Sequence, residues 1–157
     1  MANIKKKKTS NDLSLNMWLK FIRAHSTYYK RAAEHIKNFG LSLSQLWVIE
    51  CLGHSGPLIM GELCKKTFLS PGNMTFVVDG LEKAGIAERV YAEEDRRVIL
   101  VRLTPKGGKI YAEAFSNHAV FLTRLASVLT SEEQEELARL LKKLGLALSD
   151  KSKGSSG

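Results

Sequence analysis

Two arginines beside a cluster of acids are the residues whose types and spacing first suggest a chemical role. Residues 93–107 read EEDRRVILVRLTPKG, so three acids come directly before Arg96 and Arg97, and an alternating run follows. In an extended strand, Asp95 and Arg97 would point to one side and Arg96 to the other. A carboxylate two residues away can hold a guanidinium in one bidentate geometry. The spacing therefore predicts a fixed cation at Arg97; the alternative is an ordinary exposed ion pair worth about 0–1 kcal/mol.

The other reactive side chains do not form a catalytic or metal-binding pattern. Four histidines are spread over three predicted elements without paired ligand spacing: His25, His35, His54 and His118. Cys51 and Cys64 have neither metal-type spacing nor a disulfide framework, and Cys51 is expected to be a packing residue. No Ser-His-Asp order, phosphate-binding glycine loop, pair of catalytic carboxylates or cofactor fingerprint is recognisable. We therefore expect no enzyme, no metal site and no cofactor.

The length and composition of the chain predict one folded unit. Its 157 residues allow one substantial core, and 44% hydrophobic with 25% charged residues is typical of folded domains. No apolar run approaches the roughly 20 residues that cross a bilayer, and no apolar stretch follows the N-terminal lysines. These features predict a cytoplasmic protein without a membrane partner.

The positive charge is concentrated near the N-terminus. The formal net charge is +8, and residues 1–40 carry nine basic against two acidic residues, four of the nine being Lys5–Lys8. Residues 60–109 are nearly balanced, with nine basic and seven acidic residues. The total charge is therefore weak evidence for a nucleic-acid partner, and the lysine run is expected to be a solvated tail.

Helical periodicity dominates the first part of the chain. A capping box of Ser42 and Gln45 predicts a helix from Leu43, and residues 58–67, LIMGELCKKT, are expected to form a short third helix. Before them, apolar residues recur every three or four positions on a long helix that ends at Gly40: Trp18, Ile22, His25, Tyr29, Ala32, Ala33 and Ile36. The first helix is thus expected to have one apolar face.

A fourth helix is predicted within residues 69–90, LSPGNMTFVVDGLEKAGIAERV. Ser70 is its expected N-cap, Pro71 takes the first helical position, and Gly85 is the expected stop. A stripe of four residues is expected to be buried: Met74, Val77, Val78 and Leu81. The opposite face is largely uncharged and partly aromatic, which is unusual for a solvated helix: Gly72, Asn73, Thr75, Phe76 and Asp79. A core position for Phe76 is the alternative.

A change to a period of two then predicts a β-hairpin, with strands at residues 87–92 and 97–103. Thr104 and Pro105 cap the next helix, and Thr130 or Ser131 caps the last one. Their apolar stripes are too broad for lone surface helices, because a monomer could not bury them completely. These stripes predict a dimer.

The order of elements, together with LSPGNMTFVVDGLEKAGIAER and EEDRRVILVRLTPKG, resembles the MarR (multiple antibiotic resistance regulator) family of bacterial transcription factors. The resemblance covers essentially the whole ordered chain, and residues 41–109 carry it. It implies a mainly α fold with a small β-hairpin wing, in which a winged helix-turn-helix is flanked by N- and C-terminal dimerisation helices. One intertwined unit is expected, with a basic disordered tail (1–12), a dimerisation helix (13–40), the winged DNA-binding domain (41–104), C-terminal dimerisation helices (105–149) and a polar tail (150–157).

The resemblance further implies a homodimeric repressor that binds double-stranded DNA at a pseudo-palindromic operator. The fourth helix would enter the major groove and the wing the minor groove. Major-groove contacts are expected from Ser70, Gly72, Asn73, Thr75 and Phe76. The wing would contribute Asp95 and Arg97. Phosphate contacts are expected from Lys65, Lys66, Arg96, Lys106 and Lys109. Gly72 and Phe76 depart from the polar or basic residues that many members carry, which leaves the target sequence open.

An input signal is also implied, namely a small phenolic or aromatic effector bound between the dimerisation helices and the winged domain. Its expected lining, which could instead be ordinary core, is His25, Tyr28, Tyr29, Trp47 and His118. Three alternatives stay open: a thiol- or metal-responsive regulator of the same fold, an enzyme, and a winged domain that contacts protein or RNA. The first is disfavoured because the first helix lacks a cysteine and no metal-ligand spacing occurs.

Overall fold

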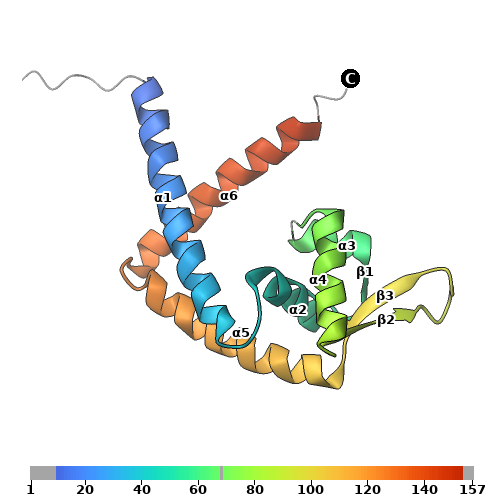
Figure 1. The fold of residues 1–157 in the computed structure, drawn as a ribbon. Coiled ribbons are helices and arrows are strands. Elements are labelled where there is room, and N and C mark those ends of the chain that lie inside the picture. The colour runs from blue at the N-terminus through green and yellow to red at the C-terminus, as the bar shows by residue number, and fades with distance from the viewer. Residues whose placement is uncertain (1–9, 68, 154–157) are drawn as a thin grey trace, which may run out of the picture. The chain divides into compact units, whose positions relative to one another are not determined.

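The computed structural model describes residues 10–67 and 69–153, and it confirms a mainly α-helical winged fold (Figure 1). The chain divides into two compact units between Ala119 and Val120. Its elements are α1 (Ser10–Lys37), α2 (Leu43–Ser55), β1 (Leu58–Ile59), α3 (Met60–Thr67), α4 (Pro71–Lys83), β2 (Ala87–Tyr91), β3 (Ile99–Leu103), α5 (Pro105–Ala126) and α6 (Ser131–Lys153).

Among the described residues, three strands form an antiparallel sheet in the order β1-β3-β2, one strand more than the predicted hairpin. Residues 58–59 were expected to open the third helix. Instead Leu58 pairs with Val101 and Ile59 with Leu100, and α3 begins at Met60. The reason is that a short strand satisfies backbone groups along the otherwise free edge of β3, and Leu58 becomes buried there.

The start of the second hairpin strand also differs from its prediction. The strand was expected from Arg97, but β3 begins at Ile99, opposite Tyr91. The Val98 N–H donates to the Asp95 carbonyl at 2.9 Å, which closes a turn over residues 95–98. The two arginines of the wing therefore lie in the reversal of the chain rather than in a strand.

The predicted helix caps are confirmed where the structure describes them. Gln45 N–H donates to Ser42 Oγ at the start of α2, and Asn73 N–H donates to Ser70 Oγ at the start of α4. Thr130, one of two candidates, caps α6 through a reciprocal pair of bonds with Glu133. These bonds satisfy N–H groups that would otherwise lack a partner in the first helical turn.

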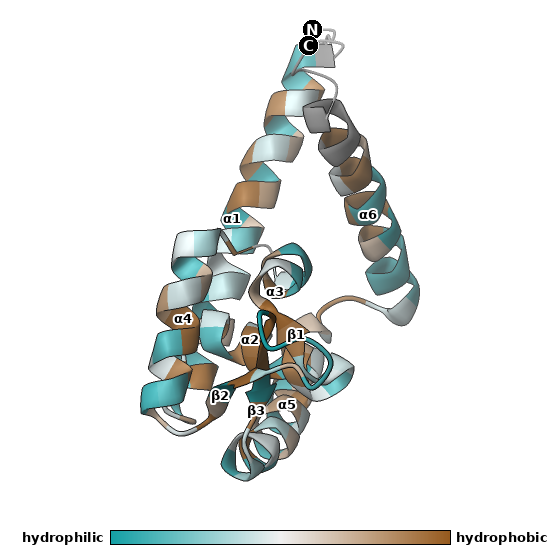
Figure 2. Ribbon diagram, turned by 90° about the vertical axis from the view of Figure 1, so that its right-hand side faces the viewer, coloured by the Kyte–Doolittle hydropathy of each residue, from teal (hydrophilic) through white to brown (hydrophobic). Residues whose placement is uncertain are grey.

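The core of the winged region lies between α2, α3, α4 and the sheet. Each of these elements contributes completely buried side chains: Ile49, Leu63, Met74, Leu81 and Val101. Figure 2 shows hydrophobic residues along α2 and β1, whereas the connection between β2 and β3 is hydrophilic. The core thus fixes α4 and the base of the wing on one scaffold.

A tight joint connects β3 to α5. Thr104 Oγ1 accepts the Gly107 N–H at 3.1 Å and donates to the Gly85 carbonyl at 2.7 Å. Gly107 is buried, and a Cβ at this position would overlap the Ile86 carbonyl oxygen. Gly107 is therefore needed for close approach of two backbone segments.

Both long terminal helices extend beyond their predicted ends. Helix α1 begins at Ser10, within the predicted tail of residues 1–12, and α6 continues to Lys153, within the predicted tail of residues 150–157. The remaining parts of those tails, residues 1–9 and 154–157, lie outside the described residues. No helix in the described part of the chain has the length and apolar character needed to span a membrane.

Candidate nucleic-acid interface

The outward face of α4 carries little charge and exposes an aromatic ring. Phe76 is 80% exposed, whereas Met74 and Val78 on the opposite face are completely buried. The alternative core position for Phe76 is therefore wrong. Gly72 lies one helical turn before Phe76, and a Cβ added there would meet no atom within 4 Å. The fold itself supplies no steric reason for this glycine.

Hydrogen bonds within α4 already use some of its polar groups. The Ser70 hydroxyl oxygen accepts the Asn73 N–H at 3.4 Å, and the Thr75 hydroxyl donates to the Pro71 carbonyl at 3.1 Å. The hydroxyl hydrogen of Thr75 is thus directed into the helix. What Thr75 can offer to a molecule outside is its methyl group and the lone pairs of its oxygen.

Asp95 and Arg97 form the contact that their spacing predicted, but for a different reason. Arg97 Nε donates to Asp95 Oδ1 and Nη2 to Oδ2, both at 3.1 Å, and the Arg97 backbone N–H donates to Oδ1 at 2.9 Å. The carboxylate therefore bonds both the turn backbone and the guanidinium, so turn geometry rather than strand alternation aligns them. These bonds from Arg97 hold the pKa of the Asp95 carboxyl below its usual value. The Arg97 side chain remains 91% exposed.

The predicted phosphate-binding cations have different surroundings. Lys65 and Lys66 lie in the last turn of α3, Arg96 is exposed in the wing turn, and Lys109 is exposed in the first turns of α5. Lys106 Nζ donates to the Ala84 carbonyl at 2.6 Å, so this lysine covers the end of α4. One of its three N–H donors is thereby used, a structural role that local sequence spacing did not indicate.

Arg89 positions α4 and was not among the residues predicted from the sequence. Its guanidinium contacts Asp79 Oδ1 at 2.8 Å and also Glu82, and its backbone N–H donates to Glu82 Oε1 at 2.9 Å. Arg89 thus links β2, the first strand of the wing, to α4 and holds this helix in place against the wing. Strand alternation was the available signal in the sequence, because it places Arg89 on the same face as the apolar Ala87.

The predicted effector residues are only partly brought together. The rings of His25 and Tyr29 lie 5.8 Å apart, and Tyr29 meets Trp47 edge-on at 6.4 Å, so three of the five form one aromatic row. Tyr28 is exposed on α1. His118 does not belong to this row, because it is buried against His35, with their Nδ1 atoms 3.3 Å apart. Periodicity within a single helix could not show which turn of α1 His118 would meet.

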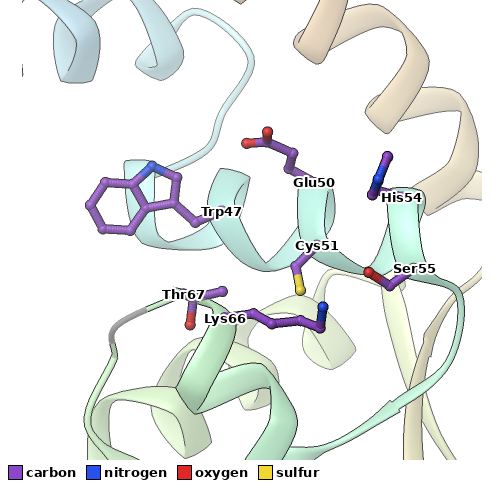
Figure 3. Close-up of a pocket in the computed structure, with 7 residues that line it drawn as sticks. All are labelled: Trp47, Glu50, Cys51, His54, Ser55, Lys66 and Thr67. Carbon is purple, nitrogen blue, oxygen red and sulfur yellow. The ribbon is translucent and has the colours of Figure 1, made fainter. Parts of the chain in front are cut away.

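A pocket of about 770 Å³ opens beside Trp47 (Figure 3). Its lining comes from α2 and the end of α3: Trp47, Glu50, Cys51, His54, Ser55, Lys66 and Thr67. Figure 3 shows the Cys51 thiol directed toward the Lys66 side chain. Burial raises the pKa of the Cys51 thiol, and the charge of Lys66 opposes this only in part. A raised pKa disfavours the reactive thiolate.

Comparisons with known proteins agree with this architecture. Residues 39–98 match the model of the MarR family. The HTH-type transcriptional regulator MhqR of Bacillus subtilis (strain 168) is 32% identical over 85% of this chain and 92% of its own length. The HTH-type transcriptional repressor MdtR of the same organism is 30% identical over 73% of this chain and 74% of its own. A mutant of Escherichia coli MarR, solved in complex with operator DNA, has a similar fold, with a TM-score of 0.76, 22% identity and coverage of 87% of this chain and 98% of that one.

The order of elements, the exposed face of α4 and the three-stranded antiparallel sheet define a winged helix-turn-helix fold. The relatives named above place this fold in the class of transcriptional regulators. The similarity to MhqR extends over most of both chains and includes the winged region. The chain therefore belongs to the MarR family and is a DNA-binding transcriptional regulator rather than an enzyme.

Proposed function

We propose that the protein is a homodimeric repressor that binds a pseudo-palindromic operator and is released from it by a small aromatic effector. In this proposal the α4 helix of each subunit enters a major groove, and Arg97 of each wing enters a flanking minor groove. Repression is supported by the similarity to MdtR, which is named a transcriptional repressor. Operator binding is supported by the similarity in fold to the E. coli MarR mutant that was solved with operator DNA.

The main observation in support of the proposal is that the Arg97 guanidinium is exposed and is held by two hydrogen bonds to Asp95. Its geometry is set by Asp95 before any partner arrives, while 91% of the side chain faces solvent. A narrow A·T-rich minor groove concentrates negative potential and attracts an arginine of this kind. Arg96, the preceding residue of the wing turn, and Lys109 on α5 are exposed cations that would supply phosphate contacts.

Dimer formation is supported by the apolar side chains that each terminal helix exposes. On α1 these include Leu15, Trp18 and Ile22, which are 39–59% exposed. On α6 every residue from 131 to 148 is exposed, including a row at helical spacing: Leu137, Leu141, Leu144 and Leu148. A helix in a protein is stabilised mainly by packing of its apolar face. We therefore propose that a second subunit packs against these exposed apolar faces.

Effector binding is proposed for the pocket beside Trp47. The pocket volume of about 770 Å³ lies within the range of small-molecule sites. Trp47 lines this pocket and also contacts Tyr29, which in turn contacts His25. A thiol-responsive mechanism at Cys51 is the weaker candidate, since burial raises the pKa of this thiol.

Selection of duplexes from a random pool by the full-length protein tests the proposal. We expect an inverted repeat whose half-sites are about 10 bp apart, bound by two chains per site. Replacement of Arg97 by Ala should weaken binding and relax the preference for A·T pairs that flank each half-site. Recovery of duplexes without any shared sequence would contradict the proposal and favour a winged domain with another partner.

A further inference from the structure

The chemistry that α4 can offer to a base pair is unusually limited. The helix contains no arginine, and its single lysine, Lys83, stands at its last position. Arginine and lysine make the commonest specific contact to DNA, a bidentate bond to guanine. The N-terminal turns of a recognition helix are the part that reaches base edges. Helix α4 therefore cannot recognise guanine in that way.

The groups exposed on these N-terminal turns are mainly apolar. Phe76 is 80% exposed, and its position follows Gly72 by one turn, so no side chain at 72 covers the ring from that side. Thr75 stands next to it and has its hydroxyl hydrogen bonded to Pro71. An aromatic ring, a threonine methyl group and a bare stretch of backbone are thus presented together.

Thymine is the base that such a surface fits. In the major groove its C5-methyl is the apolar group that distinguishes an A·T pair, and Phe and the Thr methyl are side chains that contact it. Asn73, the exposed amide of the same turns, suits the adenine edge, which offers one donor and one acceptor. Both kinds of contact select A·T pairs.

Gly72 supports the same conclusion by a separate argument. Glycine is roughly 1 kcal/mol less favourable than alanine in a helix interior, and Gly72 occupies the second position of α4. An added Cβ would meet nothing within 4 Å, and the residue is not among the glycines with positive φ. The chain's own geometry does not require glycine here, and the missing side chain leaves the backbone open to close approach by an external molecule.

We propose that each α4 recognises thymine through its C5-methyl group, which packs against the Phe76 ring over Gly72, with the Thr75 methyl beside it. The inference rests on the proposed operator binding and adds the base that determines specificity. This recognition of thymine is by apolar contact, so it depends on the methyl group and not on the hydrogen-bonding pattern of thymine.

Replacement of single thymines by deoxyuridine in the selected operator tests the inference, because it removes one methyl and leaves base pairing intact. With the unmodified full-length protein, at least one position in each half-site should lose about fourfold in affinity, the value for one buried methyl. With Phe76→Ala, the difference between the thymine and deoxyuridine operators should fall below about twofold. Phe76 is exposed, so this variant should unfold at an unchanged urea concentration.

Two further variants define the outcome. Thr75→Ser, which keeps the hydroxyl and removes the methyl, should reduce discrimination at one position, and Lys83→Ala should leave discrimination unchanged at every position. The inference is overturned if no deoxyuridine position matters, or if Phe76→Ala retains the full difference. Selection that yields no operator at all would instead refute the proposed operator binding, so the two failures are distinguishable.

Discussion

Asp95 accepts three hydrogen bonds from Arg97, one from the backbone N–H and two from the guanidinium. The wing turn therefore contains an acid that neutralises a cation and at the same time orders it. A simple charge argument predicts that removing Asp95 strengthens DNA binding, because the protein becomes more positive. An argument from preorganisation predicts the opposite, since a rotamer-rich side chain would then be ordered only on binding.

We expect Asp95→Ala to weaken operator affinity by about two- to tenfold, the range for immobilising one flexible side chain. Glu94→Ala is the matched control, because it makes the same change in charge at the neighbouring exposed residue. Titrations at several salt concentrations separate the two effects. Tighter binding by Asp95→Ala throughout the salt range would show that the acid is merely repulsive.

The wing illustrates what the sequence can and cannot predict. The contact of Asp95 with Arg97 is local, so residue types two positions apart were enough to predict it. The backbone of the wing was predicted incorrectly, because the start of β3 is decided by its pairing with β2 and by the need to reverse the chain. Caps such as Ser42 and Ser70 were predicted correctly for the same reason as the wing contact: their partners lie three residues away.

Contacts between distant residues could not be predicted in this way. The pairing of Leu58 with Val101, the bond of Lys106 to Ala84 and the stacking of His118 on His35 all depend on the arrangement of several elements. Periodicity identified the buried stripe of α4, but it gave no information on which helices and strands that stripe would contact.

The close approach of Gly107 to Ile86 gives a prediction about stability. Gly107→Ala would make a Cβ overlap the Ile86 carbonyl oxygen, so the joint between β3 and α5 must shift. We expect a loss of about 2–3 kcal/mol in the free energy of unfolding. Urea denaturation followed by circular dichroism measures this loss.

Gly108 supplies the control in the adjacent position of the same helix. A Cβ there would meet no atom within 4 Å. Gly108→Ala should therefore be neutral or stabilise the fold by up to about 1 kcal/mol, through helix propensity alone. Equal losses for both variants would show that general helix effects, and not the Ile86 contact, are responsible.

The His118 and His35 pair predicts how stability depends on pH. Burial, and secondarily the charge of His35, lower the pKa of His118 below its ordinary value of 6.5. The unfolded chain therefore binds a proton more readily than the folded one at pH values below about 6.5. The contribution of neutral His118 to the free energy of unfolding is complete above this pH. It is lost as the pH falls toward the lowered pKa of His118 in the folded protein.

We expect the urea midpoint to decrease between pH 7.5 and pH 5.5, at a fixed protein concentration because subunit association also affects stability. His118→Leu should reduce this decrease, while His54→Leu, at an exposed histidine, should retain it. If the His118 variant kept the full pH dependence, other groups would have to account for the loss.

The exposed row on α6 predicts where the dimer can be disrupted. Leu141 and Leu144 are 41% and 38% exposed in the single chain, three positions apart on a helix whose residues 131–148 are all exposed. Burying them against a second subunit would remove apolar surface from water at roughly 25 cal/mol per Å². Leu144→Asp would place a charge within that contact, where it would lack a partner. We expect light scattering at micromolar concentration to give a dimer for the unmodified protein and a large monomer fraction for Leu144→Asp.

Lys142 provides the control for this change in charge. Lys142→Ala makes the same one-unit change in net charge on the same helix and should remain dimeric. Because each operator half-site needs one winged domain, Leu144→Asp should also lose affinity for the full operator while its affinity for a single half-site is retained. A dimer that persists in Leu144→Asp would mean that α6 does not form the subunit contact.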